Sequence, residues 1–260
     1  MLILEKGLHP LDERYVGEYA LRDDMSARVQ GVPASLRCPL CLGVLVQTHR
    51  QRRGYAYFKH LSDSDSARCP LATSSYQPEG LIVSASPRPL VAQEQRGRFL
   101  FNWKRHFRIA RGMVPGLSLE RFTELIEYAD VLNLWSYSPL ELKDVPYVLL
   151  VLAGFMAVRG GEEELTWVRF WFDGSVRDAG DLWRAGAPAV QLFRLVYRNP
   201  FHTPFPTAAE LLYWERVVRV ERAQDIDGAA ISRSEMRAFD RFVKRNAATR
   251  DAHREDGDDE

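Results

Sequence analysis

Three cysteines and one histidine form the feature that most constrains this chain. Cys38 and Cys41 stand in a Cys-x-x-Cys turn, His60 follows after 18 residues, and Cys69 follows after eight more. Zinc prefers thiolate and imidazole ligands arranged in a tetrahedron, and three cysteines with one histidine are one of the closed sets that structural sites use. The spacing therefore predicts that Cys38, Cys41, His60 and Cys69 together bind one zinc ion.

The residues between the two ligand pairs are typical of a hairpin. Segments 43–48 and 55–58 are β-prone, and the basic run HRQRRG separates them, with Gly54 in the turn. A Ser- and Asp-rich loop at 62–67 then leads to Cys69. A β-module of this size buries too little apolar surface to be stable alone, so the free energy of metal binding becomes free energy of folding.

Other interpretations of these residues stay open at this point. The Cys-x-x-Cys pair is also the spacing of a thioredoxin-like redox motif, although the flanking strand and helix of that motif are not visible here. The cysteines can also be small core residues with His60 on the surface. His49 is a rival to His60 as the ligand, but it falls in the basic hairpin loop.

The strings RCPLC, YAYFKH and ARCPL resemble the N-terminal zinc-ribbon-like domain of the CoiA-like competence proteins. In that family a CPxC is followed by a hairpin, an aromatic-x-His at its end, and a further cysteine. The resemblance covers residues 31–72, and it implies zinc binding by these four ligands. It also implies a later restriction-endonuclease-like domain with an Asp and a (D/E)xK. The helix after the zinc module usually carries a Glu/Ser–His–Lys signature, whereas this chain has NWKRHF with His106.

Asp130, Glu141 and Lys143 are the candidates for such a nuclease site. Two carboxylates can hold Mg²⁺, which polarises a phosphate and activates water, while a lysine stabilises the developing charge. The alternative is that Asp130 ends a helix and that the other two residues lie in a solvated loop. A second acidic group, Asp173 with Asp178 and Asp181, is better explained by the turn DGS and by an N-cap at Asp181.

The net charge of zero hides a segregation of charge along the chain. Residues 31–111 hold 13 Lys/Arg and 4 Asp/Glu, a net charge of +9, whereas residues 112–190 carry a net charge of −6. A basic block is typical of nucleic-acid binding, and the alternative is that the two blocks neutralise each other across an interface. The candidate nucleic-acid-binding residues are Arg50, Arg52, Arg53, Lys59, Arg105 and Arg108.

Beyond the cysteines the sequence predicts a mixed domain of helices and strands. An aromatic stripe of Phe99, Trp103 and Phe107 indicates a helix over 93–111, and Ser118 is a good N-cap for a second helix. The run after Asp144 is compatible with a helix or a strand. Further predictions are a strand at 166–172, a strand or helix at 191–197, a helix at 208–220, and a helix from a capping box of Ser232 and Glu235 to about residue 248.

These elements give an α+β fold: a small zinc-ribbon-like β-module followed by a mixed helix and strand domain. The predicted divisions are a module at 1–72, a linker at 73–92, a mixed domain at 93–248 and a disordered acidic tail at 249–260. The longest apolar run has 14 residues, too short to span a membrane, and three cysteines indicate a reducing cytoplasm. The predicted function is non-catalytic, zinc-dependent binding of nucleic acid or of a partner in a nucleic-acid process. A CoiA-like nuclease and an interaction module with a purely structural zinc are the alternatives.

Overall fold

The computed structural model describes residues 6–8, 15–17, 28–29, 32–33, 36–49, 56–75, 80–159, 165–186, 189–219 and 230–255. The fold is α+β, as predicted, with helices and antiparallel strands. The chain forms two compact units, each built from two separate stretches of sequence. Unit 1 comprises residues 1–82 and 151–219, and unit 2 comprises residues 83–150 and 220–260.

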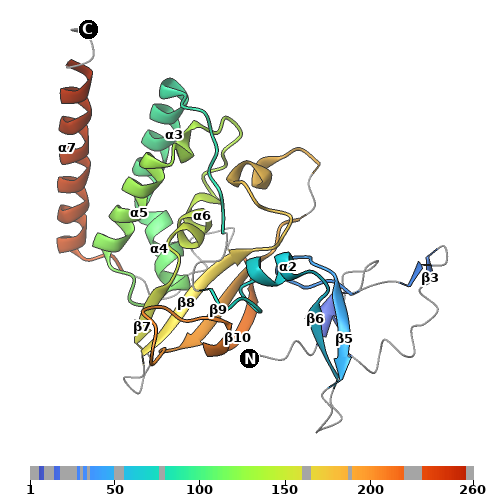
Figure 1. Ribbon diagram of the computed structural model, residues 1–260. Helices are drawn as coiled ribbons and strands as arrows, with labels where there is room; N and C mark the ends of the chain where they lie inside the picture. The colour runs from blue at the N-terminus through green and yellow to red at the C-terminus, as the bar shows by residue number, and fades with distance from the viewer. Residues whose placement is uncertain are drawn as a thin grey trace. The chain divides into compact units, whose positions relative to one another are not determined.

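A four-stranded antiparallel sheet is the largest element of unit 1 (Figure 1). Its strands lie in the order β10-β9-β8-β7, and they are β7 (Met156–Arg159), β8 (Leu165–Phe172), β9 (Leu192–Arg198) and β10 (Leu211–Val217). Aromatic and β-branched residues dominate β8, which confirms the strand predicted at 166–172. The segment at 191–197, open between strand and helix, is a strand.

The helix predicted at 208–220 is wrong. A single 3₁₀ turn, η3 (Ala208–Glu210), stands at its start, and residues 211–217 form the edge strand β10. Thr207 and Glu210 cap each other within that one turn, and the chain then pairs with β9 over six residue pairs. The hydrogen bonds of a sheet edge thus prevail over the helical periodicity of the segment.

The segment that carries the cysteines is a hairpin followed by a short helix. Strands β5 (Leu45–His49) and β6 (Ala56–His60) pair antiparallel, which confirms the predicted hairpin. The predicted loop at 62–67 is instead the helix α2 (Asp63–Arg68), since Asp63 and Asp65 occupy its first turn and Arg68 its last, where each charge favours the helix dipole. Four shorter strands pair two by two in the N-terminal residues: β1 (Lys6–Leu8), β2 (Tyr15–Gly17), β3 (Arg28–Val29) and β4 (Val32–Pro33).

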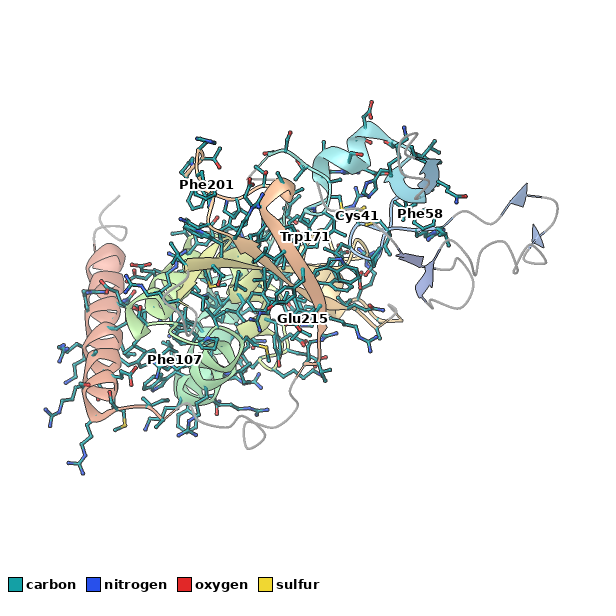
Figure 2. All side chains as sticks on the ribbon, turned by 90° about the horizontal axis from the view of Figure 1, so that it is seen from below. Cys41, Phe58, Phe107, Trp171, Phe201 and Glu215 are labelled. Atoms are coloured by element: carbon teal, nitrogen blue, oxygen red, sulfur yellow. The ribbon has the colours of Figure 1, made fainter. Side chains whose placement is uncertain are left out.

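The hairpin segment and the sheet bury one common core. Phe58 of β6, Trp171 of β8 and Phe193 of β9 belong to one apolar cluster, and Cys41 packs against it. Phe58, Trp171 and Cys41 are labelled in Figure 2. Leu36, Leu40 and Leu71 complete the hairpin side of this cluster. The units therefore differ from the division predicted at residues 72 and 93, because the sheet shares its core with the cysteine segment.

Unit 2 is helical. Its elements are α3 (Pro89–Phe101), α4 (Trp103–Met113), α5 (Leu119–Val131), η1 (Leu134–Ser136) and α7 (Arg233–Glu255), together with most of α6 (Val145–Leu152), which leads into unit 1. The predicted aromatic stripe is confirmed, since Phe99, Trp103 and Phe107 are buried. The single helix predicted at 93–111 is two helices, because the first begins at Pro89 and the chain turns at Asn102.

The helix caps predicted from the sequence of unit 2 are present. The side chain of Ser118 accepts a hydrogen bond from the backbone N–H of Arg121 at 3.1 Å and begins α5. Ser232 and Glu235 exchange the two hydrogen bonds of a capping box at the start of α7. That helix continues to Glu255, so the first part of the tail predicted as disordered is helical. The run after Asp144, open between strand and helix, is helical.

Candidate metal centre

The first two sulfurs are placed by a tight turn between Cys38 and Cys41. The backbone N–H of Leu42 donates to the carbonyl of Cys38 at 2.9 Å, and the N–H of Cys38 donates to the carbonyl of Gly43 at 2.8 Å. The N–H of Gly43 also donates to Sγ of Cys41 at 3.4 Å. Leu42 adopts a φ of 60°, a left-handed conformation that a leucine adopts at a cost.

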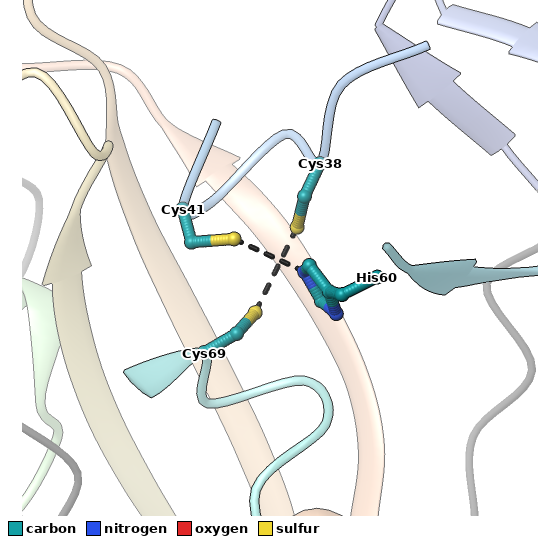
Figure 3. A group of neighbouring side chains, drawn as sticks. All are labelled: Cys38, Cys41, His60 and Cys69. Carbon is teal, nitrogen blue, oxygen red and sulfur yellow. Dashed lines mark hydrogen bonds between the residues drawn. The ribbon is translucent and has the colours of Figure 1, made fainter. Parts of the chain in front are cut away.

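The other two ligands are placed by the hairpin and by α2. His60 is the last residue of β6 and pairs with Leu45, which lies just beyond the turn of the first two cysteines. Cys69 caps the C-terminal end of α2, where its N–H donates to the carbonyl of Asp65 at 3.0 Å. The short helix therefore turns the chain back, so that the fourth ligand faces the other three (Figure 3).

The four ligand atoms converge on one point. All of them lie within 4.8 Å of one another, with 3.7 Å between the Sγ atoms of Cys38 and Cys69 and 3.1 Å between Sγ of Cys41 and Nε2 of His60. Zn–S bonds of about 2.3 Å in a tetrahedron place two sulfurs about 3.8 Å apart. A disulfide needs about 2.05 Å, and all three cysteines are free. The group is thus close enough to hold a metal ion.

Burial disfavours the charged thiolate form of these cysteines unless a cation offsets the negative charge. Burial raises the pKa of the Cys38 thiol to about 12, and burial likewise raises the pKa of Cys69. The pKa of Cys41 is lowered, first because the neighbouring Cys38 side chain hydrogen-bonds to it and then because Cys69 does. One side of the group therefore stays protonated without a positive ion, and a divalent cation would supply the missing charge.

The sheet supports the turn of the first two cysteines directly. A Cβ atom on Gly174, in the turn after β8, would lie 2.3 Å from the carbonyl oxygen of Cys41 and 2.6 Å from its carbonyl carbon. No side chain fits there, so Gly174 lets the two backbones meet. Sequence analysis assigned this DGS segment only to a turn, and its glycine was the available signal of close backbone approach.

Three of the four ligands are buried, and Cys41 is partly exposed. A cavity of about 140 Å³ reaches the centre on the Cys41 side, between Arg68, Arg177, Trp171 and Gly174. A tetrahedral ion held by all four side chains would have no position left for water or substrate. The group is therefore compatible with a closed structural site.

The carboxylates considered for magnesium do not form a comparable group. Asp130 lies on α5, where both of its oxygens accept hydrogen bonds from Arg96 at 2.7 and 2.8 Å and one also accepts from Trp135. Glu141 and Lys143 form an exposed ion pair with each other at 2.6 Å. Among the described residues, only the cysteine and histidine group brings three or more potential metal ligands together.

The acidic residues after β8 serve local structure. Asp173 accepts from the N–H of Ser175 at 2.9 Å and from the N–H of Gln191 at 2.6 Å, which fixes the turn. Asp178 caps the 3₁₀ helix η2 (Ala179–Trp183), and Asp181 is the third residue of that capping box. The turn interpretation is confirmed, although the N-cap is Asp178 and not Asp181 as predicted.

The candidate nucleic-acid-binding residues are spread over both units. Arg50, Arg52 and Arg53 lie outside the described residues. Lys59 is exposed on β6 of unit 1, whereas Arg105 and Arg108 are exposed on α4 of unit 2. That these six residues share one face stays a prediction. No helix within the described ranges combines the length and the apolar character that a membrane span requires.

Comparison with known proteins gives no assignment: no protein-family model, curated protein or solved structure matches this chain. The resemblance of residues 31–72 to the CoiA-like proteins therefore stays a prediction.

Proposed function

We propose that the chain is a non-catalytic zinc protein that binds nucleic acid, in which the metal holds the hairpin segment against the sheet. The observation that carries the metal is the convergence of three cysteine sulfurs and one imidazole nitrogen within 4.8 Å, largely buried. This donor set is one that zinc uses in structural sites. Because Cys38 and Cys69 belong to the same apolar cluster as the sheet, the ion stabilises the core of unit 1 as well as the hairpin.

Elemental analysis and hydrogen exchange test the metal. We expect about one zinc per chain, since the four ligands form one closed site. Cys38→Ser and Cys69→Ser should each release the ion and remove the amide protection of β5 and β6. Helix α5 of unit 2 serves as the internal control and should keep its protection. Full protection of β5 and β6 in metal-free protein would rule out the structural role.

The net charge of +9 over residues 31–111 supports the nucleic-acid part of the proposal. Cations that meet phosphates release condensed counterions, so binding should weaken steeply as salt is raised. Replacing Arg50, Arg52 and Arg53 together by alanine should weaken DNA or RNA binding and flatten its salt dependence. A matched control replaces three exposed cations of α7, Arg237, Arg241 and Lys244, and changes the net charge equally. Equal losses of binding affinity in the two variants would show that binding depends only on the net charge of the protein.

The nuclease alternative is tested by incubating the protein with DNA or RNA in Mg²⁺ or Mn²⁺. We expect no cleavage, because Asp130 is held by Arg96 and Glu141 is paired with Lys143 at the surface. Glu141→Ala is the better control variant for this assay, since its side chain is exposed and its loss leaves the core intact. Cleavage that disappears in Glu141→Ala would replace the non-catalytic proposal with the nuclease.

A further inference from the structure

A line of exposed cations around one exposed aromatic ring runs along α3 and α4. Arg98, Phe101, Lys104, Arg105 and Arg108 are all exposed, and we refer to these five residues as the α3–α4 stripe. Arg98 and Phe101 are three residues apart on α3, and Arg105 and Arg108 are three residues apart on α4, a spacing that places each pair on one side of its helix. The opposite side of the same helices is buried, as Phe99, Trp103 and Phe107 show.

A single residue, Asn102, joins the two halves of the stripe. Its N–H donates to the carbonyl of Arg98 at 3.3 Å and ends α3, and its carbonyl accepts from the N–H of His106 at 3.3 Å and begins α4. Arg98 and Phe101 in the last turn of α3 therefore lie only a few residues from Lys104, Arg105 and Arg108 of α4.

Phe101 is a large apolar residue on the solvent-exposed side of α3. Its side chain is 88% exposed, whereas Phe99 on the same helix is fully buried. Residues three apart on a helix are neighbours, so Arg98 lies beside the ring on α3, and Arg105 follows four residues later on α4. The ring thus adds nothing to the core of unit 2 and lies close in sequence to the exposed cations on both sides of it.

Three cations of the stripe keep their charge available. Within the described part of the chain, Arg98, Lys104 and Arg108 form no ion pair, whereas the neighbouring Arg96 and Arg111 are paired with Asp130 and Glu235. The stripe itself contains no acidic residue. Its charge is therefore complementary to a row of phosphates.

We propose that the α3–α4 stripe binds single-stranded nucleic acid, with a base stacked on Phe101 and the flanking phosphates on Arg98, Lys104 and Arg108. The proposal rests on the nucleic-acid binding proposed above and specifies its substrate class. Bases in a duplex are stacked on each other, so an isolated ring on a helix surface reaches a base face only in an unpaired strand. A helix that lies on a membrane needs a broad apolar face, and this stripe has one apolar residue.

The test measures fluorescence anisotropy of a labelled 12-nucleotide strand and of the matched duplex with full-length zinc-loaded protein. Phe101→Ala should weaken single-strand binding by at least about fivefold, since one stacked base contributes roughly that factor or more, and should change duplex binding little. Phe101→Trp should restore the affinity. Phe201→Ala is the matched control, because that phenylalanine of unit 1 is 90% exposed (Figure 2) and lies outside the stripe. The triple variant Arg98→Ala, Lys104→Ala, Arg108→Ala should lower the salt slope by about two.

The outcomes separate the two proposals. If the unmodified protein binds neither strand nor duplex at low salt, the proposed function fails, and this inference fails with it. If the protein binds but Phe101→Ala matches Phe201→Ala, or weakens duplex binding equally, the inference alone is overturned. Binding to phosphatidylserine vesicles that depends on Phe101, without binding to the oligonucleotide, would replace nucleic acid with a membrane surface. Selective single-strand loss with rescue by Phe101→Trp supports the proposal.

Discussion

His106 should make unit 2 sensitive to mild acid. Its side chain is 2% exposed, and neither ring nitrogen has a hydrogen-bond partner among the described residues. The ring stacks on Phe99 with centroids 4.5 Å apart and planes 4° from parallel. Burial, and to a smaller extent the positive charge of Arg105, lower the pKa of His106 to about 4. The native state therefore holds this imidazole neutral.

The direction and size of the effect follow from linkage. A histidine with a lowered native pKa leaves stability unchanged above its unfolded pKa of 6.5, because neither state binds the proton there. As pH falls below 6.5 the unfolded state takes up the proton and the native state does not, so stability falls by about 1.4 kcal/mol per pH unit. Between pH 6.5 and 5.0 the loss reaches about 2 kcal/mol, and it levels off near pH 4. The lowered pKa of Glu235, about 2, acts only below pH 4.5.

The assay is urea unfolding of the protein at pH 7.5, 6.5, 5.5 and 5.0. Amide exchange in α4 and α5 is the readout for unit 2. His106→Phe keeps an aromatic ring against Phe99 and removes the titrating group, so its stability should be nearly flat over this range. It should also gain about 1 kcal/mol at pH 7.5, because two buried nitrogens without partners are removed. His202→Ala, at an exposed histidine, controls for general effects of histidine removal. Parallel losses in the unmodified and His106→Phe proteins would refute the reasoning.

Three further predictions concern residues that the structure singles out. Gly174→Ala should lower the affinity for zinc in a competition assay and lower the free energy of unfolding by about 1–3 kcal/mol, because its Cβ would displace the carbonyl of Cys41. Gly80→Ala is the control: a Cβ there makes only ordinary contacts, so neither quantity should change. Leu42→Gly should stabilise unit 1 by roughly 0.5–1 kcal/mol in urea unfolding, since it relieves a left-handed leucine, and destabilisation would contradict this. Asp130→Ala should destabilise unit 2 by about 3 kcal/mol, because it leaves the buried Arg96 without its ion-pair partner. An unchanged urea unfolding midpoint would contradict this prediction.

The convergence of the four candidate metal ligands could be predicted because metal chemistry restricts both residue type and spacing. A Cys-x-x-Cys turn fixes two sulfurs locally, and a hairpin is the shortest route that returns the chain to them. The supporting residues could not be found in the same way. Gly174 meets Cys41 only after a sheet far along the chain has folded, so its glycine signals a close backbone approach without indicating which segment approaches.

The errors in the elements have a common physical cause. Residues 211–217 have helical periodicity, yet they form β10, because β9 offers an unpaired edge that only the tertiary structure reveals. Residues 63–68 are too polar and too short for a helical prediction, yet α2 forms between the candidate ligands His60 and Cys69, and the backbone N–H of Cys69 caps its C-terminal end. Where the predicted element is present, as at the capping box of Ser232, the hydrogen bonds that decide it join residues only a few positions apart.

The metal centre also bears on how unit 1 assembles from two separate stretches of sequence. Cys38 and Cys69 are only 31 residues apart, so an ion can close this segment at a small cost in chain entropy. The sheet residues of the same core, such as Trp171 and Phe193, come from beyond unit 2 in the chain and must close a much longer loop. A segment closed by an ion would present Leu36, Leu40 and Leu71 as a formed apolar surface. On this proposal the ion would stabilise the sheet indirectly, because without it the sheet has to order the hairpin segment while it folds.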